Sequence, residues 1–312
     1  MPSETRFASP TGPVVVTGGG GFIGRSVVAA LRAVDVEVVV VDVDPVATTD
    51  PGVTTIRGDL ADPDVRERAM AAGPTSLVHL AAATSVLVST RRPVETYRTN
   101  VEITQELLEA CRTHGVGRFV LASTNAVVGN VGEQMINEAL PLRPLTPYGA
   151  TKAACEMLLS GYSGAYDIST CALRFSNVYG PGMAHKDSFV PRLMRGALSG
   201  EGVQVYGDGT QRRDLVHVAD VAAAVLRALA LDVEGPVIIG SGRSGSVLEL
   251  IEAAREATGR AIAAEHVPAV RGEMPAVVID IGRARAELGW SPSMSLAEGL
   301  ATVWDDFRRR AA

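Results

Sequence analysis

The chain carries a glycine-rich run, Thr17–Gly24, directly after a short run of valines. The glycines Gly18, Gly21 and Gly24 permit a tight turn, close approach of the backbone to a pyrophosphate, and close packing of a helix on a strand. A helix that starts here offers free N–H groups and the positive end of its dipole to phosphate. The run predicts a dinucleotide-binding loop, with a plain strand-to-helix turn as the alternative.

An acidic side chain follows at the end of the next predicted strand. Asp42 lies about 20 residues after the loop, where a carboxylate can bind the ribose hydroxyls of a dinucleotide. A carboxylate there also repels a 2′-phosphate, and Asp44 follows it with no Arg or Lys nearby. The sequence therefore favours NAD over NADP. Asp59 is interpreted as a contact of the adenine amine or as a helix N-cap.

A second chemical group is the pair Tyr148 and Lys152, which lie one helical turn apart. A tyrosine with its ordinary pKa of about 10 is a poor base near neutral pH. A neighbouring ammonium and a positive nicotinamide ring would lower that pKa. The pair predicts proton exchange with a substrate hydroxyl during hydride transfer. Ser123 and Thr124 end another predicted strand and add hydroxyls there, unless they only cap their own backbone.

Valine-rich runs alternate with helical patterns through the first half of the chain. Runs without polar alternation indicate strands buried on both faces, and hence a parallel sheet covered by helices. We predict an α/β fold with a doubly wound parallel sheet of the Rossmann type. The strands are expected over 13–17, 36–42, 53–57, 77–80, 118–122 and 170–175, and the helices over 22–33, 62–72, 94–114 and 147–162. A helix near 220–230 and a strand near 237–240 are expected to return to this sheet.

These elements predict two domains. An NAD-binding domain is expected over 13–176, with returning segments near 217–242. A second, smaller C-terminal substrate-binding domain is expected over 177–216 and 243–312. Residues 1–12 lack an apolar signal core and are interpreted as a flexible tail, which favours a cytoplasmic protein.

Composition excludes several classes of partner. The net charge of −6 argues against binding of nucleic acid, which needs a basic face. The apolar runs are too short to span a membrane. Cys111, Cys155 and Cys171 are far apart and odd in number, which indicates a reducing compartment and neither a disulfide framework nor a metal site.

Together with the loop and the Tyr/Lys pair, further segments resemble the extended short-chain dehydrogenase/reductase family, in its nucleotide-sugar epimerase/dehydratase branch. The resemblance runs from about Pro13 to about Trp290, nearly the whole chain. The additional segments that carry it are His79–Ala82, Leu121–Gly129, Leu173–Gly180 and Gly207–Asp220.

The resemblance implies site residues and an oligomeric state. Tyr148, Lys152 and Thr124 would form a catalytic triad, with Ser123 beside it. The expected NAD contacts are Gly18, Gly21, Phe22, Ile23, Gly24, Asp42, Asp59, Leu60, Leu80, Ala81, Ala82, Asn100, Tyr148 and Lys152. The expected substrate contacts are Thr84, Thr124, Tyr148, Asn177, Phe189, Val190, Arg192, Tyr206, Gln211, Arg213 and Arg271.

Some of these roles have plainer alternatives. Arg213 and Arg271 would pair with a diphosphate, or else form surface salt bridges. Phe189, Val190 and Tyr206 would border a nucleobase, or else pack in the core.

The resemblance also implies a homodimer that pairs the helices expected over 94–114 and 147–162. Apolar residues at helical spacing support this expectation, but burial against their own sheet is the alternative. These residues are Val101, Leu107, Leu108, Met157 and Leu158.

Departures from the family pattern narrow the expected chemistry. In the 4,6-dehydratases an acid pair follows the triad threonine, whereas Asn125 and Ala126 follow Thr124 here. The glutamate of the related decarboxylases is also absent. What remains is reversible oxidation and reduction at C4, with a transient 4-keto intermediate and a tightly held NAD. The resemblance implies that the substrate of this 4-epimerase is a UDP-sugar.

The sugar and two alternative functions stay open. The sugar is either glucose/galactose or glucuronate/galacturonate, and the basic segment Met183–Ser188 would meet a carboxylate, phosphates or solvent. The alternatives are a nucleotide-sugar 4-ketoreductase using NAD(P)H and a non-catalytic NAD-sensing regulator.

Overall fold

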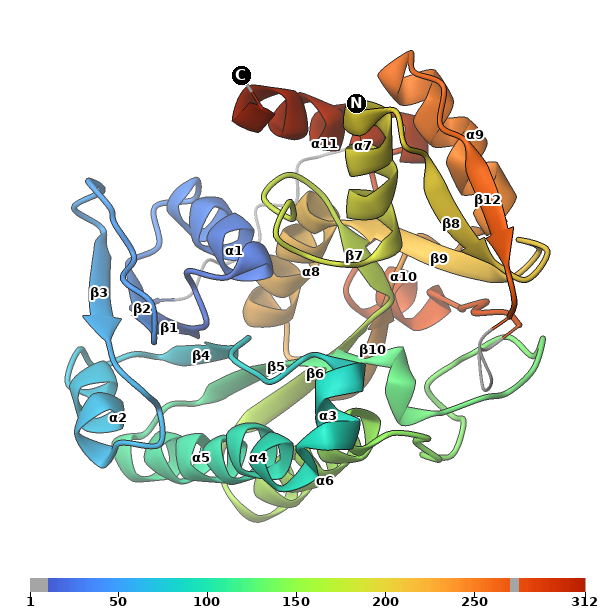
Figure 1. Cartoon of the computed structure of the whole chain (residues 1–312). Coiled ribbons are helices and arrows are strands. Elements are labelled where there is room, and N and C mark those ends of the chain that lie inside the picture. Colours follow the sequence, from blue (N-terminus) through green and yellow to red (C-terminus); the bar gives the residue numbers. More distant parts are fainter. Residues whose placement is uncertain (1–10, 270–274, 312) are drawn as a thin grey trace, which may run out of the picture.

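A computed structural model describes residues 11–269 and 275–311 of the chain (Figure 1). The first ten residues of the tail expected over 1–12 lie outside the described residues, as does Arg271.

The centre of the fold is a seven-stranded sheet in which every pair of neighbouring strands is parallel. The strand order is β10-β6-β5-β4-β1-β2-β3, so the direction of winding reverses between β1 and β4. This confirms the predicted doubly wound α/β fold. The strands are β1 (Val14–Thr17), β2 (Val38–Asp42), β3 (Val53–Arg57), β4 (Ser76–His79), β5 (Arg118–Thr124), β6 (Ser169–Phe175) and β10 (Gly235–Ile239).

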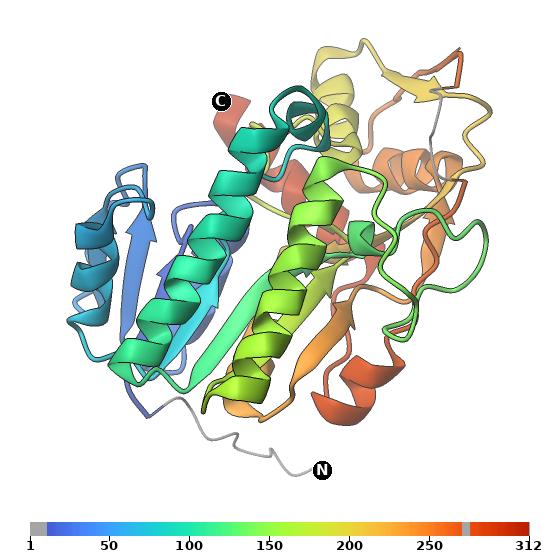
Figure 2. The same cartoon turned by 90° about the horizontal axis from the view of Figure 1, so that it is seen from below.

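Helices cover both faces of this sheet. Helices α1 (Phe22–Arg32) and α8 (Val218–Ala230) pack together on one face. Helices α2 (Pro63–Met70), α5 (Ile103–His114) and α6 (Pro147–Ala165) cover the other, where α5 and α6 run side by side (Figure 2). The valine strands β1, β2 and β4 are almost wholly buried between these layers. That burial explains why their sequences lack the polar alternation of a half-exposed strand.

The helix expected over 94–114 is confirmed in its extent, but a π-helical turn interrupts its α-helical hydrogen bonding. Two short helices, α3 (Val86–Arg91) and α4 (Pro93–Tyr97), lead into a π-helical turn over Arg98–Glu102, and α5 follows. The π turn contains the buried Asn100, whose side chain bonds to the loop after β4 and to α6. Such turns are rare within helices and cluster at functional sites.

The remaining elements form a third hydrophobic core beside the large sheet, at the upper right of Figure 1. A three-stranded sheet contains β7 (Asn177–Tyr179), β9 (Arg212–His217) and β11 (Ser244–Ser246), and β8 (Val203–Tyr206) pairs with β12 (Ala264–Val267). The helices are α7 (Phe189–Ser199), α9 (Val247–Thr258) and α11 (Leu296–Ala311).

One segment of the region expected to form the substrate domain packs elsewhere. Val277, Ile279 and Trp290 belong to the core of the large sheet, and α10 (Gly282–Glu287) contacts β10. Residues after position 243 thus contribute both to the core of the large sheet and to the third core. The expected domain boundary at residue 243 therefore remains a proposal.

Within the described ranges, no helix is long and apolar enough to cross a membrane. The three cysteines are buried and free. The same residues contain no group of three or more His, Cys, Asp or Glu placed to hold a metal ion.

Asp220 ties the large sheet to the C-terminal segment. It lies buried in the first turn of α8, and its carboxylate accepts hydrogen bonds from the backbone and hydroxyl of Ser293 and from the backbone of Met294. The segment it holds leads directly into α11, which belongs to the third core.

We expect Asp220→Ala to lower the free energy of unfolding by roughly 3 kcal/mol, because buried donors lose a charged acceptor. Urea denaturation followed by circular dichroism measures this loss. Asp305→Ala on the exposed side of α11 is the control, with an expected change below about 0.5 kcal/mol. Equal losses in the two variants would contradict the prediction.

Candidate functional site

Two adjoining cavities, of about 420 and 480 Å³, lie at the carboxyl ends of the parallel strands. The first runs along the glycine loop and the ends of β2 and β4. The second holds the residues that end β5 together with Tyr148. Four residues line both cavities and so mark their junction: Phe22, Ile23, Thr84 and Lys186.

The glycine loop has the geometry of a phosphate cradle. Gly18 has a φ of +69°, and a Cβ there would lie 2.7 Å from the backbone nitrogen of Ala81. A Cβ on Gly24 would collide with the Gly18 carbonyl oxygen. No side chain caps the start of α1, and its first turn contains no acid. The helix N-terminus is therefore open to a pyrophosphate, and the loop residues fit a dinucleotide.

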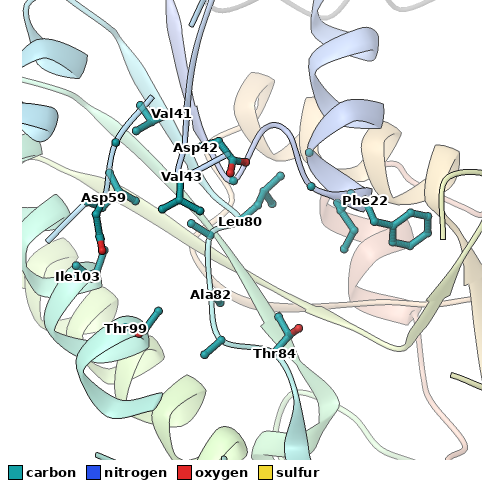
Figure 3. Close-up of a pocket in the computed structure, with 18 of the residues that line it drawn as sticks. Phe22, Val41, Asp42, Val43, Asp59, Leu80, Ala82, Thr84, Thr99 and Ile103 are labelled. Atoms are coloured by element: carbon teal, nitrogen blue, oxygen red, sulfur yellow. The ribbon is translucent and has the colours of Figure 1, made fainter. Parts of the chain in front are cut away.

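Asp42 lies on the wall of the first cavity (Figure 3). Its carboxylate accepts hydrogen bonds from the backbone of Gly20 at 2.9 Å and of Asp44 at 3.1 Å. These bonds fix the carboxylate beside the loop, where the sequence predicts a contact with ribose. Asp59 also lines this cavity and is exposed, while Asp62 caps α2.

The other predicted cofactor residues divide into lining and supporting residues. Asn100 does not line the cavity: its amide bonds to both backbone groups of Ala83 and to the Thr151 hydroxyl. It therefore supports the loop after β4 from behind the cavity lining, and its direct contact with NAD remains a prediction. The predicted residues that line the first cavity are Gly18, Gly21, Phe22, Ile23, Gly24, Asp42, Asp59, Leu60, Leu80, Ala81 and Ala82.

Tyr148 and Thr124 face the second cavity, and Lys152 lies buried one turn further along α6. Burial raises the pKa of the Tyr148 phenol to about 12, and a hydrogen bond from Thr124 acts in the opposite direction. Burial lowers the pKa of the Lys152 ammonium. Burial thus disfavours each charge alone, whereas a phenolate beside an ammonium would stabilise both. The arrangement suits a tyrosine that exchanges a proton.

A buried ion pair lies further along α6, one turn beyond Lys152. Glu156 on α6 and Arg174 on β6 are 4% and 3% exposed, and the Arg174 guanidinium donates to both carboxylate oxygens at 2.7–3.2 Å. The Ser123 hydroxyl donates to the same carboxylate. Together with Ser123 the pair therefore joins α6, β5 and β6, and α6 and β5 are the elements that carry Tyr148 and Thr124.

Sequence reasoning missed Glu156 and Arg174. Two signals were present: Glu156 continues the helix face of Tyr148 and Lys152 at a further four-residue step, and Arg174 interrupts an otherwise apolar strand. A charge inside a buried strand needs a partner.

The second cavity collects most of the predicted substrate residues. The ones that line it are Thr84, Ser123, Thr124, Tyr148, Asn177, Phe189, Val190, Arg192, Tyr206, Gln211 and Arg213. Arg192 forms a two-point ion pair with Asp187, while Asn177 and Gln211 donate to backbone oxygens. The lining residues include three cations, Lys186, Arg192 and Arg213, and no Asp or Glu among the described part of the chain.

Comparisons with known proteins agree on one family. The model of the "NAD dependent epimerase/dehydratase family" matches residues 14–240. A dTDP-glucose 4,6-dehydratase of Streptomyces niveus is 33% identical over 96% of this chain and 94% of its own. The structure of MoeE5 in complex with UDP-glucuronic acid and NAD has 38% identity and a TM-score of 0.88, covering 96% of this chain and 100% of MoeE5. The UDP-glucose 4-epimerase of Thermotoga maritima has 31% identity and a TM-score of 0.90, with the same coverage.

We expect Glu156→Gln to lower the free energy of unfolding by about 3–5 kcal/mol, because the Arg174 charge stays buried without its partner. Thermal and urea unfolding measure the loss. Glu287→Gln breaks a half-exposed pair with Arg283 and is the control, with an expected loss of about 0.5 kcal/mol or less. The apolar double replacement Glu156→Leu/Arg174→Met should recover part of the stability. A loss in Glu156→Gln as small as in the control would contradict the prediction.

Proposed function

Because the chain belongs to the NAD-dependent epimerase/dehydratase family, we propose that it inverts the configuration at C4 of a uridine diphosphate sugar. The chain is an enzyme of this family and uses NAD. The first cavity, with its glycine loop and Asp42, is the proposed NAD site. The second cavity, with Tyr148 and Thr124, is the proposed sugar-nucleotide site.

One observation favours epimerisation over dehydration. Removal of water from a sugar requires an acid that protonates the departing hydroxyl and a base that takes a proton from carbon. The residues after Thr124 are Asn125 and Ala126, and no carboxylate lies among the described residues that line the second cavity. Epimerisation needs only one group that takes and returns a single proton, and Tyr148 suffices for that.

Three residues of the chain have distinct roles in the proposed reaction. Tyr148 takes the proton of the C4 hydroxyl, and Thr124 orients that hydroxyl and the phenol. Lys152 stabilises the phenolate from within α6. When bound, NAD supplies reversible acceptance of a hydride from carbon. After the 4-keto sugar has turned, the hydride would return to the opposite face of C4 while Tyr148 returns the proton to the oxygen, so the reaction has no net change in oxidation.

The cations of the second cavity support an anionic substrate. Arg213 and Arg192 suit the diphosphate of a sugar nucleotide. MoeE5 binds UDP-glucuronic acid and, in a second complex, UDP-glucose, which keeps both a uronic acid and a hexose as candidates for this chain.

The proposed assembly is a homodimer, with a revised contact surface. Of the residues expected at the interface, Val101, Leu107 and Leu108 are buried against the chain's own sheet. Met157 is 58% exposed. The helices α3 and α4, which contact α6, also carry exposed apolar residues, namely Leu87, Val94 and Tyr97. Sedimentation of the full chain tests whether two copies pair.

The deciding experiment incubates the purified protein, without added cofactor, with UDP-glucose and separately with UDP-glucuronate. Proton NMR follows the configuration at C4. Inversion of one substrate supports the proposal and identifies the sugar. If neither inverts even with NAD supplied, but a 4-keto sugar is reduced by NAD(P)H, the chain is a ketoreductase. No turnover with bound NAD would favour a regulator.

We expect Tyr148→Phe to lower kcat by about 10²–10⁴-fold, because the proton acceptor is removed. NAD should still copurify with this variant, since the glycine loop is unchanged. Tyr166→Phe is the control: Tyr166 follows α6, lines neither cavity and is 45% exposed. Full turnover in Tyr148→Phe would remove Tyr148 from the mechanism.

Lys152→Met should move the acidic limb of the kcat–pH profile to higher pH by about 1–3 units. The rate falls as pH drops through the pKa of Tyr148, because the protonated phenol is no base. Loss of the ammonium raises that pKa, so the fall begins at a higher pH. An unchanged limb with only a lower plateau would mean that Lys152 acts through binding alone.

A further inference from the structure

The sequence contains only two lysines, Lys152 and Lys186, among 29 basic residues. Lys152 lies behind the catalytic tyrosine. Lys186 belongs to a loop over residues 180–188, which we call the strap, between β7 and α7. Lys186 is one of the four residues that line both cavities. An ammonium at this junction has no role in the proton exchange described above.

The Lys186 side chain lies against the start of helix α1. Its Nζ atom is 5.4 Å from the centre of the Phe22 ring, a cation–π distance. Phe22 is the first residue of α1, so the ammonium stands beside the helix N-terminus that the glycine loop leaves open. In the described part of the chain no acidic side chain pairs with Lys186, and burial lowers the pKa of its ammonium.

The strap holds this lysine in place by contacts of its other residues. Arg195 of α7 donates to the backbone oxygens of Ala184 and Lys186 at 3.1 and 3.0 Å. Asp187 pairs with Arg192 and Arg195, so the one acid next to Lys186 is already neutralised by two guanidinium groups. Lys186 is therefore the cation of the strap that remains available to an anion in the cavities.

We propose that Lys186 binds the pyrophosphate of the dinucleotide and so fastens the cofactor beneath the strap. The inference rests on the proposed NAD site and goes beyond it, because it assigns retention of the cofactor to a residue outside the glycine loop. A pyrophosphate on the α1 N-terminus would receive backbone N–H groups from one side and the Lys186 ammonium from the other.

The diphosphate of the sugar nucleotide is the second possible source of this anion. The second cavity offers that diphosphate two other cations, Arg192 and Arg213, whereas the first cavity is lined by Lys186 as its one Lys or Arg among the described residues. The position of Lys186 against Phe22 also favours the anion bound at the start of α1.

Equilibrium binding by calorimetry tests the proposal on protein freed of nucleotide. Lys186→Met should raise the Kd of NAD about ten-fold, which corresponds to about 1.4 kcal/mol. Lys186→Arg keeps the charge and should stay within about three-fold of the wild type. Arg285→Met removes one exposed charge from α10, outside both cavities, and should leave the Kd unchanged. In Lys186→Met the Kd of UDP should change less than that of NAD.

Amine labelling gives a second readout that needs no turnover. Acetylation of Lys186 by an N-hydroxysuccinimide ester, measured by peptide mass spectrometry, should be suppressed by NAD more strongly than by UDP. The presence of only two lysines makes the modified site unambiguous.

The outcomes separate this proposal from the proposed function. A loss of UDP affinity with unchanged NAD affinity in Lys186→Met would assign the lysine to the substrate and overturn the proposal. No change in either affinity would overturn it as well. If NAD affinity depends on Lys186 but no sugar is inverted at C4, only the proposed reaction fails.

Discussion

Helix α1 can start against the end of β1 only because side chains are missing there. A Cβ on Gly24 would collide with the carbonyl oxygen of Gly18, and a Cβ on Gly18 would meet the backbone after β4. The close approach brings the helix N-terminus to the place where the strand order reverses between β1 and β4. In open α/β sheets the ligand crevice forms at such a reversal. Because both cavities are lined by Phe22 and Ile23, the whole site depends on this steric constraint.

The two groups proposed to exchange the proton, Thr124 and Tyr148, reach the crevice from a neighbouring part of the same sheet. Thr124 is the last residue of β5, and Tyr148 lies in the first turn of α6. The buried pair of Glu156 and Arg174 joins these elements to β6. Burying two charges is costly, so such a pair is weak evidence for stability. Its consequence here is geometric, since it fixes the helix that carries Tyr148 relative to the strand that carries Thr124.

Much of this arrangement could be predicted because it rests on local rules. Runs of buried valines indicated the parallel strands, and the spacings of Gly18–Gly24 and of Tyr148 and Lys152 indicated the two halves of the site. The π turn at Asn100 could not be predicted, because it depends on bonds to Ala83 and Thr151, which are distant in sequence. The pairing of Glu156 with Arg174 is likewise a tertiary contact. The short strands β7, β9 and β11 lack any periodic pattern long enough to read.

The charged side chains that line the second cavity limit the reactions it can support more than its shape does. Its lining offers hydroxyls, amides and cations, and its described residues include no carboxylate. Such a lining can bind phosphates and exchange one proton through Tyr148, but it contains no acid to expel a hydroxyl from the sugar. Inversion at C4 would need, beside the hydride that bound NAD takes and returns, only a single proton that leaves and returns through one phenol. The shared junction at Phe22, Thr84 and Lys186 joins the proposed sugar-nucleotide site to the proposed NAD site, so the two form one continuous space.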